Sequence, residues 1–325
     1  NAVGPAIGSP EIRLRSQYIG PAKNGSLEKW SRAANSLFAS GCEPQAFALL
    51  ASFAAPLMRF HSSGEGGAIV SLINDKSGSG KTTALEAVAS VWGREEGLKL
   101  TDDDTKVSKG LALGVLGNLP CIYDELYNRD PEIIRQFVLM FTNGRDKMRA
   151  TQDGQIRHTK ATWQTILVLA SNNSIVDILS SMDGTDAPAY RLLEFHTDIP
   201  KGVKRNGDEL KRALKANSGY AGDAYLRYIV RPDVLAFVKA GLPKWTDQIW
   251  KKTGLRTEHR FWVRTIASVA VASAIVQRMG LLEFSPQRIV DWAMASVAHE
   301  GEITIDGGFG RDPISLLSEY LNSHI

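Results

Sequence analysis

Residues 67–93 constrain the fold of this chain more than any other segment. An apolar run at 68–73 leads into a glycine-rich stretch that ends in Gly80, Lys81 and Thr82, and apolar residues then recur at helical spacing. This order predicts a strand, a loop and a helix. Glycine lets backbone N–H groups approach a phosphate, and the N-terminus of a helix attracts negative charge. The segment therefore predicts a binding site for a nucleoside triphosphate.

The loop matches the phosphate-binding pattern G-x-x-x-x-G-K-[ST] except at its first position, where Asp75 replaces glycine. In that pattern Lys81 reaches the β- and γ-phosphates and Thr82 holds Mg²⁺. The predicted nucleotide contacts are Ser77, Gly78, Ser79, Gly80, Lys81, Thr82 and Thr83. The alternative is a serine- and glycine-rich turn without a ligand, and the flanking strand and helix favour the phosphate loop.

A second apolar segment, residues 119–123, ends in the adjacent carboxylates Asp124 and Glu125. A strand buried on both faces of a parallel sheet has a nearly continuous apolar sequence and presents polar side chains at its carboxyl end. We expect Asp124 to enter the Mg²⁺ shell and Glu125 to polarise the attacking water. Acidic pairs also follow strands in ordinary loops. The spacing from Lys81, with one strand and one helix between, favours the catalytic interpretation.

A third buried strand is predicted at 165–171, and it ends at Asn172 and Asn173. Asn172 is the candidate for orienting the catalytic water. Asn173 is the alternative, and both asparagines could instead cap the following helix. Arg191 begins a further strand over 190–195. An arginine there usually pairs with a surface carboxylate, but a ring-forming ATPase needs a cation that reaches the γ-phosphate of the neighbouring subunit.

Residues 147–160 predict a basic β-hairpin, because Asp153-Gly154 lies between two arms that can form strands. With that turn, cations would oppose each other on one face, which is unfavourable unless an anion lies along the arms. A phosphodiester backbone is the obvious anion. The alternative is a solvated surface hairpin.

The remaining chain is mostly helical in pattern. We expect an arm or linker at 1–25, a helical pair that braces the core at 26–66, a P-loop core with the hairpin at 67–200, and a mostly helical C-terminal domain at 201–325. In that last part the pattern predicts separate helices at 233–240 and 245–252, a long helix at 258–279, and a short strand beyond 301. Arg260 and Arg264 lie one turn apart, so both could face the same nucleotide.

Composition narrows the class of protein. The chain has 325 residues, of which 43% are hydrophobic, enough for about two domains. Its most hydrophobic run, 266–276, is shorter than the roughly 20 residues of a membrane span. A net charge of +3 is too small to indicate nucleic-acid binding without local basic clusters.

Cysteine content and the first residue add two expectations. With only Cys42 and Cys121, neither a disulfide framework nor a cysteine metal site is expected, and a reducing cytoplasm fits best. Because the chain opens on Asn1 rather than methionine, we expect a fragment of a longer protein.

In this order, these motifs resemble those of AAA+ ATPases. More narrowly, the chain resembles superfamily 3 and MCM-like helicase domains encoded by phages and mobile elements, including a widespread family known only as a domain of unknown function. The resemblance covers about 27–298. It rests on 47–57, the phosphate loop, 89–93, Asp124-Glu125, the hairpin before the asparagine strand, and 219–222.

The resemblance implies a fold and a set of roles. The fold is α/β, an AAA+ parallel sheet of the additional-strand P-loop type, flanked by helices and followed by a mostly helical domain. Asn172 matches the first sensor, Arg191 the arginine finger acting in trans, and Arg264 or Arg260 a second sensor. The hairpin would line the pore of a hexamer, and the residues that would grip single-stranded DNA there are Lys147, Arg149, Arg157, His158 and Lys160.

We therefore expect an ATP- and Mg²⁺-dependent, ring-forming helicase or translocase that acts on single-stranded DNA in the cytoplasm of a host cell. A primase or polymerase domain, or a partner, would recruit it. Two alternatives stay open. One is a P-loop kinase of a small substrate, which needs no basic hairpin, and the other is an ATP-binding scaffold or initiator that assembles on DNA without unwinding it.

Overall fold

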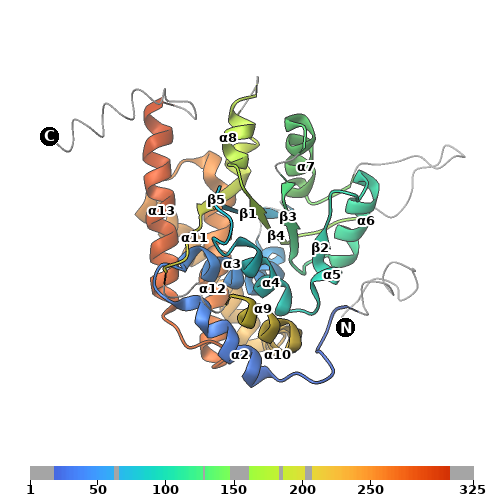
Figure 1. The fold of residues 1–325 in the computed structure, drawn as a ribbon. Helices are drawn as coiled ribbons and strands as arrows, with labels where there is room; N and C mark the ends of the chain where they lie inside the picture. The colour runs from blue at the N-terminus through green and yellow to red at the C-terminus, as the bar shows by residue number, and fades with distance from the viewer. Residues whose placement is uncertain are drawn as a thin grey trace, which may run out of the picture.

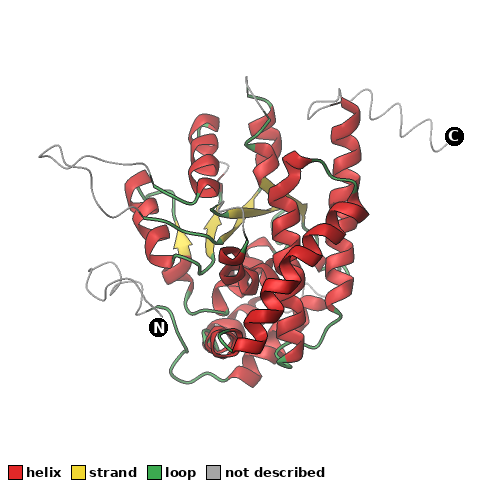
Figure 2. Ribbon diagram, turned by 180° about the vertical axis from the view of Figure 1, so that it is seen from behind, coloured by secondary structure: helices red, strands yellow, loops and turns green. Residues whose placement is uncertain are grey.

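The computed structural model describes residues 18–61, 66–126, 129–146, 161–182, 186–201 and 207–307, with the backbone alone for 299–307. At its centre is a five-stranded parallel sheet in the order β2-β3-β4-β1-β5 (Figure 2). Its strands are β1 (Ala68–Ile73), β2 (Lys99–Leu100), β3 (Cys121–Asp124), β4 (Ile166–Ser171) and β5 (Leu192–His196). Because β4 lies between β1 and β3, the predicted α/β fold with an additional strand is confirmed.

The three apolar runs that predict buried strands coincide with β1, β3 and β4 to within two residues. Every residue of β4 is buried, and β1 is exposed only in part at Ile73. Strands covered on both faces have no polar alternation, which is why the unbroken apolar sequence identifies them. Arg191 lies in the short 3₁₀ helix η4 (Ala189–Arg191), immediately before β5.

Several helices before residue 201 begin or end at residues that typically start or stop a helix. Helix α7 begins after the N-cap Asp130, whose Oδ1 accepts a hydrogen bond from the Glu132 backbone N–H at 2.8 Å, and ends at Gly144 with φ 67°. The chain passes from α3 into a 3₁₀ helix at Ala55, next to Pro56. The elements are α2 (Leu27–Asn35), η1 (Ser36–Phe38), α3 (Glu43–Ala54), η2 (Ala55–Phe60), α4 (Lys81–Ser90), α5 (Glu95–Leu98), α6 (Lys106–Leu116), α7 (Pro131–Asn143) and α8 (Ile175–Ser180).

Helices make up the described chain after residue 207, and α11, α12 and α13 lie together on one side of the molecule (Figure 1). They are α9 (Gly207–Ala216), α10 (Tyr220–Ile229), α11 (Pro232–Thr253), η6 (Thr257–His259), α12 (Arg260–Arg278) and α13 (Pro286–Gly307). None of the helices in the described ranges combines the length and apolarity that a bilayer crossing requires.

Two expectations for this region are wrong. The segments 233–240 and 245–252 form one helix, α11, with Pro243 inside it. Pro243 is exposed, while Val238, Leu242 and Ile249 are buried, so packing of the inner face keeps the helix continuous despite the proline. The short strand expected beyond 301 is also absent as far as Gly307, because α13 continues to that residue. Extending an existing helix costs less than starting a new element.

One continuous hydrophobic core joins the sheet to helices from both ends of the chain. Phe53 of α3 packs edge to face on Trp30 of α2 and Tyr225 of α10, with ring centroids 6.0 and 5.0 Å apart. Helix α12 packs against both α3 and α11. The helices of 26–66 and those after 207 therefore share the core of the sheet, and the division of the chain into domains stays a prediction.

Candidate nucleotide-binding site

The phosphate loop connects the end of β1 to the start of α4 at Lys81. Gly78 and Gly80 have φ angles of 74° and 87°, in the left-handed region that side chains disfavour. A Cβ on Gly80 would also lie 2.5 Å from Ile199 Cδ1. The glycines of the motif are thus needed for the shape of the loop itself.

Hydrogen bonds from residues that the sequence analysis did not identify hold the phosphate loop on its protein side. Gln45, buried in α3, donates through Nε2 to the carbonyl oxygens of Ser79 and Asp198, both at 3.1 Å. Thr197 Oγ1 donates to Ser79 Oγ at 3.3 Å, so the Ser79 side chain faces the protein interior rather than a ligand. A buried glutamine in the mostly apolar α3 was the sequence signal for this contact. Ser77, Gly78 and Thr82 are exposed.

Lys81 lies where three strands end. Its Nζ donates to Asn172 Oδ1 at 3.0 Å and also to the backbone oxygen of Asn74. Burial lowers the pKa of Lys81, while the carboxylates of Asp124, Asp75 and Glu125 act in the opposite direction. The structure therefore brings together the predicted phosphate lysine, the acidic pair and the predicted sensor.

The asparagine alternatives have a clear geometric outcome. The side chain of Asn172 reaches Lys81, whereas the backbone N–H and carbonyl of Asn173 both bond Ser171 Oγ. The N-cap of α8 is Ser174, whose Oγ accepts from the Asp177 N–H at 2.9 Å. The idea that the asparagines cap α8 is therefore wrong, because the hydroxyl nearest the helix start takes that position.

The acidic pair terminates β3. Asp124 pairs with Ala170 of β4, and burial raises the pKa of its carboxyl, with Lys99 lowering it. Glu125 is exposed and has a φ of 63°, a backbone conformation that costs roughly 1 kcal/mol or more for a residue with a side chain. Its N–H donates to the Ala170 oxygen at 3.0 Å. This turn directs two successive carboxylates away from the strand beside Lys81.

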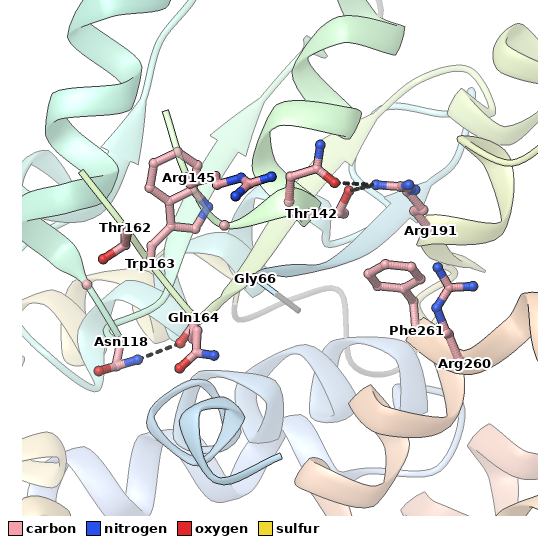
Figure 3. A pocket seen from close by; sticks show the side chains of 13 residues that line it. Gly66, Asn118, Thr142, Arg145, Thr162, Trp163, Gln164, Arg191, Arg260 and Phe261 are labelled. Carbon is pink, nitrogen blue, oxygen red and sulfur yellow. Dashed lines mark hydrogen bonds between the residues drawn. The ribbon is translucent and has the colours of Figure 1, made fainter. Parts of the chain in front are cut away.

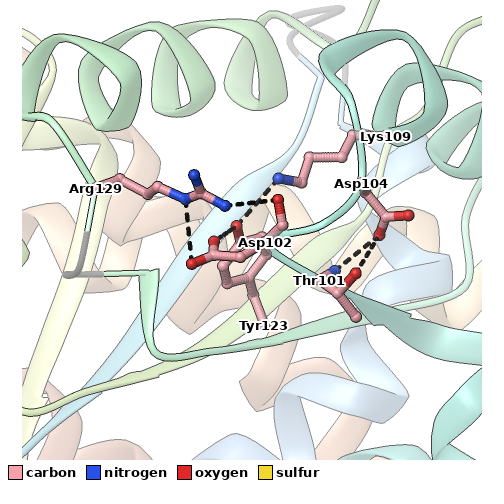
Figure 4. Close-up of polar contacts among 6 residues, drawn as sticks. All are labelled: Thr101, Asp102, Asp104, Lys109, Tyr123 and Arg129. Carbon is pink, nitrogen blue, oxygen red and sulfur yellow. Dashed lines mark hydrogen bonds and ion pairs between the residues drawn. The ribbon is translucent and has the colours of Figure 1, made fainter.

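A polar cluster fixes the strand just behind Asp124 (Figure 4). Tyr123 donates its hydroxyl proton to Asp102 Oδ1 at 2.5 Å, and Lys109 Nζ donates to the Tyr123 oxygen at 3.1 Å. Arg129 pairs with the Asp102 carboxylate at 3.1 Å. Asp104 accepts from the N–H and the hydroxyl of Thr101 at 2.8 and 3.0 Å. Asp102 and Asp104 thus serve as structural hydrogen-bond acceptors. Within the described ranges, no group of three or more His, Cys, Asp or Glu side chains is placed to hold a metal ion.

The predicted arginines gather elsewhere, in a cavity of about 680 Å³ (Figure 3). Arg145, Arg191 and Arg260 line it, together with neutral residues. Arg191 Nη1 donates to Thr142 Oγ1 at 2.8 Å and to Asn143 Oδ1 at 3.1 Å. Arg191 and Arg260 lie over the Phe261 ring, 5.3 and 5.0 Å from its centroid.

This cavity is at the opposite end of the sheet from the phosphate loop. Arg191 precedes β5, the phosphate loop follows β1, and the two strands are parallel. A strand of this length separates the two edges by roughly 20 Å. Arg264 belongs to the cavity end as well, since it acts with burial to lower the pKa of His61 to about 3. The arginines therefore do not reach the Lys81 site of their own chain.

The predicted DNA contacts Lys147, Arg149, Arg157, His158 and Lys160 lie outside the described residues. The residues on either side of them are described. Arg145 pairs with Thr162 in an antiparallel bridge, and the Asp146 N–H donates to the Ala161 oxygen at 3.1 Å. The chain segments that enter and leave 147–160 therefore run antiparallel. We call these flanking residues, 145–146 and 161–162, the base of the segment, and the cavity lined by Arg145 and Thr162 lies there.

Comparisons with known proteins support the fold. A family model described as a domain of unknown function (DUF927) matches residues 11–161. No curated protein matches the chain. A solved structure titled "SCCmec type IV Cch - active helicase" is similar over 86% of this chain with a TM-score of 0.67 and 19% identity. The chain spans about half of that structure's length, 51%. The chain thus has a helicase-like α/β P-loop fold with a helical C-terminal region.

Proposed function

We propose that this chain is an ATP-dependent, ring-forming helicase or translocase that acts on single-stranded DNA. The observation that carries the proposal is the convergence of Lys81, Asn172 and Asp124 at the carboxyl edge of adjacent parallel strands. Ligands of open α/β sheets bind at this edge. The helicase-like fold supports the nucleic-acid part of the proposal.

The residues at this edge fit a triphosphate and its metal ion. Two left-handed glycines expose backbone N–H groups at the start of α4, and the Lys81 ammonium lies beside them. Thr82 and Asp124 supply the hard oxygen ligands that Mg²⁺ prefers, and they would hold it where it neutralises phosphate charge.

Three side chains would then have separate roles in hydrolysis. Lys81 binds the terminal phosphates, Glu125 accepts a proton from the attacking water, and Asn172 orients that water. The Lys81–Asn172 hydrogen bond of 3.0 Å supports this role, because Asn172 would then lie near the γ-phosphate that Lys81 would bind. Glu125 is exposed beside this position, as a base that meets water must be.

We assign Arg191 to the phosphate of a neighbouring subunit. The phosphate loop of its own chain is a strand length away, and Arg191 lines one cavity together with Arg145 and Arg260. A ring built by a heterologous interface would bring this end of one chain to the phosphate loop of the next. Of the two proposed second sensors, Arg260 lines the cavity, whereas Arg264 is 5% exposed.

The basic segment 147–160 provides the proposed DNA contact, because its four lysine and arginine side chains can each neutralise a backbone phosphate and His158 can add a hydrogen bond. Its base joins β4, the strand that ends at Asn172. A nucleotide-dependent shift of Asn172 can therefore be transmitted along β4 to the DNA-binding segment.

Two substitutions test this assignment. Lys81→Ala should reduce hydrolysis by about 100-fold or more, since it removes the positive charge that stabilises the transferred phosphate. It should leave single-stranded DNA binding intact. Arg149→Ala should keep basal hydrolysis and lose its stimulation by single-stranded DNA. Steady-state ATPase assays measure hydrolysis with and without single-stranded DNA, and fluorescence anisotropy measures DNA binding. Unchanged DNA stimulation in Arg149→Ala and Lys147→Ala would refute the role of the segment, and a fully active Lys81→Ala would refute the nucleotide site.

A further inference from the structure

Glu194 is a carboxylate in the sheet to which the chemistry above gives no role. It lies in β5, opposite Ser71 of β1, and is partly buried. Ser71 Oγ donates to its Oε2 at 2.8 Å, and Ser174 Oγ donates to its Oε1 at 2.5 Å. The Ile175 backbone N–H also donates to Oε2, at 3.1 Å. One side chain thus joins β1, β5 and the start of α8.

The segment held by Glu194 is the short loop that contains Asn172. This loop runs from the end of β4 to Ser174, and Asn172 is the residue that accepts a hydrogen bond from Lys81. Ser171 Oγ closes the loop from within by donating to the Asn173 oxygen at 2.6 Å. Because Glu194 holds its far end at Ser174, the loop cannot shift relative to β1 and β5 without breaking these bonds.

Strand β5 connects Glu194 to Arg191. Arg191 immediately precedes β5, and Glu194 is the third residue of that strand. A displacement of Arg191 along the strand direction would therefore act on Glu194, and through Ser174 on the Asn172 loop. Backbone hydrogen bonds between β1 and β5 make this strand pair a stiff connection.

We propose that Glu194 is a positioning residue for nucleotide hydrolysis, which holds the Asn172 loop on Lys81 and makes it move together with the strand that follows Arg191. The inference rests on the proposed function. Glu194 acts through Asn172 and not on the phosphate or the attacking water.

The carboxylate also makes the contact sensitive to protons. Burial raises the pKa of Glu194 to about 7, although the hydrogen bonds from Ser174, Ser71 and the Ile175 N–H lower it. In the described part of the chain, Asp177 of α8 is the charged side chain that acts on it, and raises its pKa further. The ionised form accepts these hydrogen bonds best, so the loop is held more firmly above pH 7 than below it.

Steady-state kinetics on Glu194 variants provide the first test. Glu194→Ala should lower kcat about tenfold and leave KM within about twofold, since Asn172 loses its position while the phosphate loop is untouched. Glu194→Gln keeps the shape and, like protonated Glu194, has one acceptor oxygen, so its kcat at pH 8 should lie between those of Glu194→Ala and wild type. Wild type should lose activity from pH 8 to pH 6, and Glu194→Gln should lack that step.

Hydrogen exchange in the absence of nucleotide provides a second readout. The Ile175 amide should lose protection in Glu194→Ala and keep it in Glu194→Gln. If Glu194→Ala does not fold, Ser71→Ala removes one donor to the same carboxylate. Its matched control is Ser273→Ala, which removes a buried hydroxyl of α12 that bonds the Val269 oxygen at 2.6 Å. Ser71→Ala should lower kcat more than Ser273→Ala does.

The outcomes separate this inference from the proposed function. An active wild type whose Glu194→Ala variant keeps its kcat and its Ile175 protection overturns the inference alone. Equal losses in Ser71→Ala and Ser273→Ala overturn it too, because they indicate a general effect on stability. If the wild-type protein hydrolyses no triphosphate, Lys81→Ala has no activity to reduce, and the proposed function is overturned instead.

Discussion

Lys81 is subject to two opposing effects. Burial lowers the pKa of its ammonium, and three carboxylates, those of Asp124, Asp75 and Glu125, raise it. Asp124 and Glu125 have proposed roles in the chemistry. Asp75 has none, and it occupies the position where the phosphate-loop pattern has glycine. Its negative charge favours a charged Lys81 and at the same time repels the phosphates that Lys81 would bind.

Replacing Asp75 should therefore improve nucleotide binding. Asp75→Gly should lower the KM for ATP about three- to tenfold at low salt, because one like charge near the phosphates amounts to about 1 kcal/mol. The difference should shrink as salt rises, since Asp75 is exposed. Asp103→Gly, another exposed aspartate, is the control and should leave KM unchanged. If KM in Asp75→Gly equals the wild-type value at every salt concentration, the repulsion is negligible.

Among the elements, α3 and the phosphate loop depend on each other through Gln45. Replacing it by the similarly sized leucine should leave the carbonyl oxygens of Ser79 and Asp198 without the Gln45 donor. We expect Gln45→Leu to lose about 1–2 kcal/mol of unfolding free energy and to raise KM for ATP several-fold.

Urea unfolding and ATPase kinetics measure the two effects of Gln45→Leu. The control is Ser52→Ala in the same helix, whose hydroxyl donates to the Val88 oxygen at 2.8 Å. It should lose stability without a change in KM. A normal KM in Gln45→Leu would mean that Gln45 contributes to stability and not to the binding conformation of the loop.

The sequence predicts those elements whose signals are local. Strands β1, β3 and β4 are visible because burial on both faces demands an unbroken apolar run, and the phosphate loop because its backbone demands glycine. The predicted break in α11 was wrong because the continuity of this helix depends on contacts that are not local. Contacts of its buried face with α12 and α13, which the local sequence of α11 does not contain, hold the helix together around Pro243.

Parts of the candidate site depend on tertiary contacts that no local pattern contains. Gln45 is 34 residues from the loop it supports, and Glu194 is 123 residues from Ser71. The place of Arg191 at the far edge follows from strand direction, once β5 is known to be parallel to β1. The position of Asn172 beside Lys81, by contrast, was predictable, because Asn172 directly follows a strand that lies next to the phosphate-loop strand.

For the whole molecule, the two ends of the sheet have complementary chemistry. One end has the phosphate loop and its carboxylates, and the other has the cavity of Arg145, Arg191 and Arg260. Contact between unlike ends generates a closed ring or an open filament. The account therefore predicts that one chain supplies Lys81 and the next supplies Arg191 at every active site.

Mixing two inactive variants tests this claim most directly. Lys81→Ala and Arg191→Ala should each hydrolyse ATP at least tenfold more slowly than wild type. In an equal mixture, about a quarter of the interfaces would pair an intact Lys81 with an intact Arg191, so activity should recover toward that fraction of wild type. A mixture no more active than its components, or an Arg191→Ala variant with wild-type hydrolysis, would contradict the shared site.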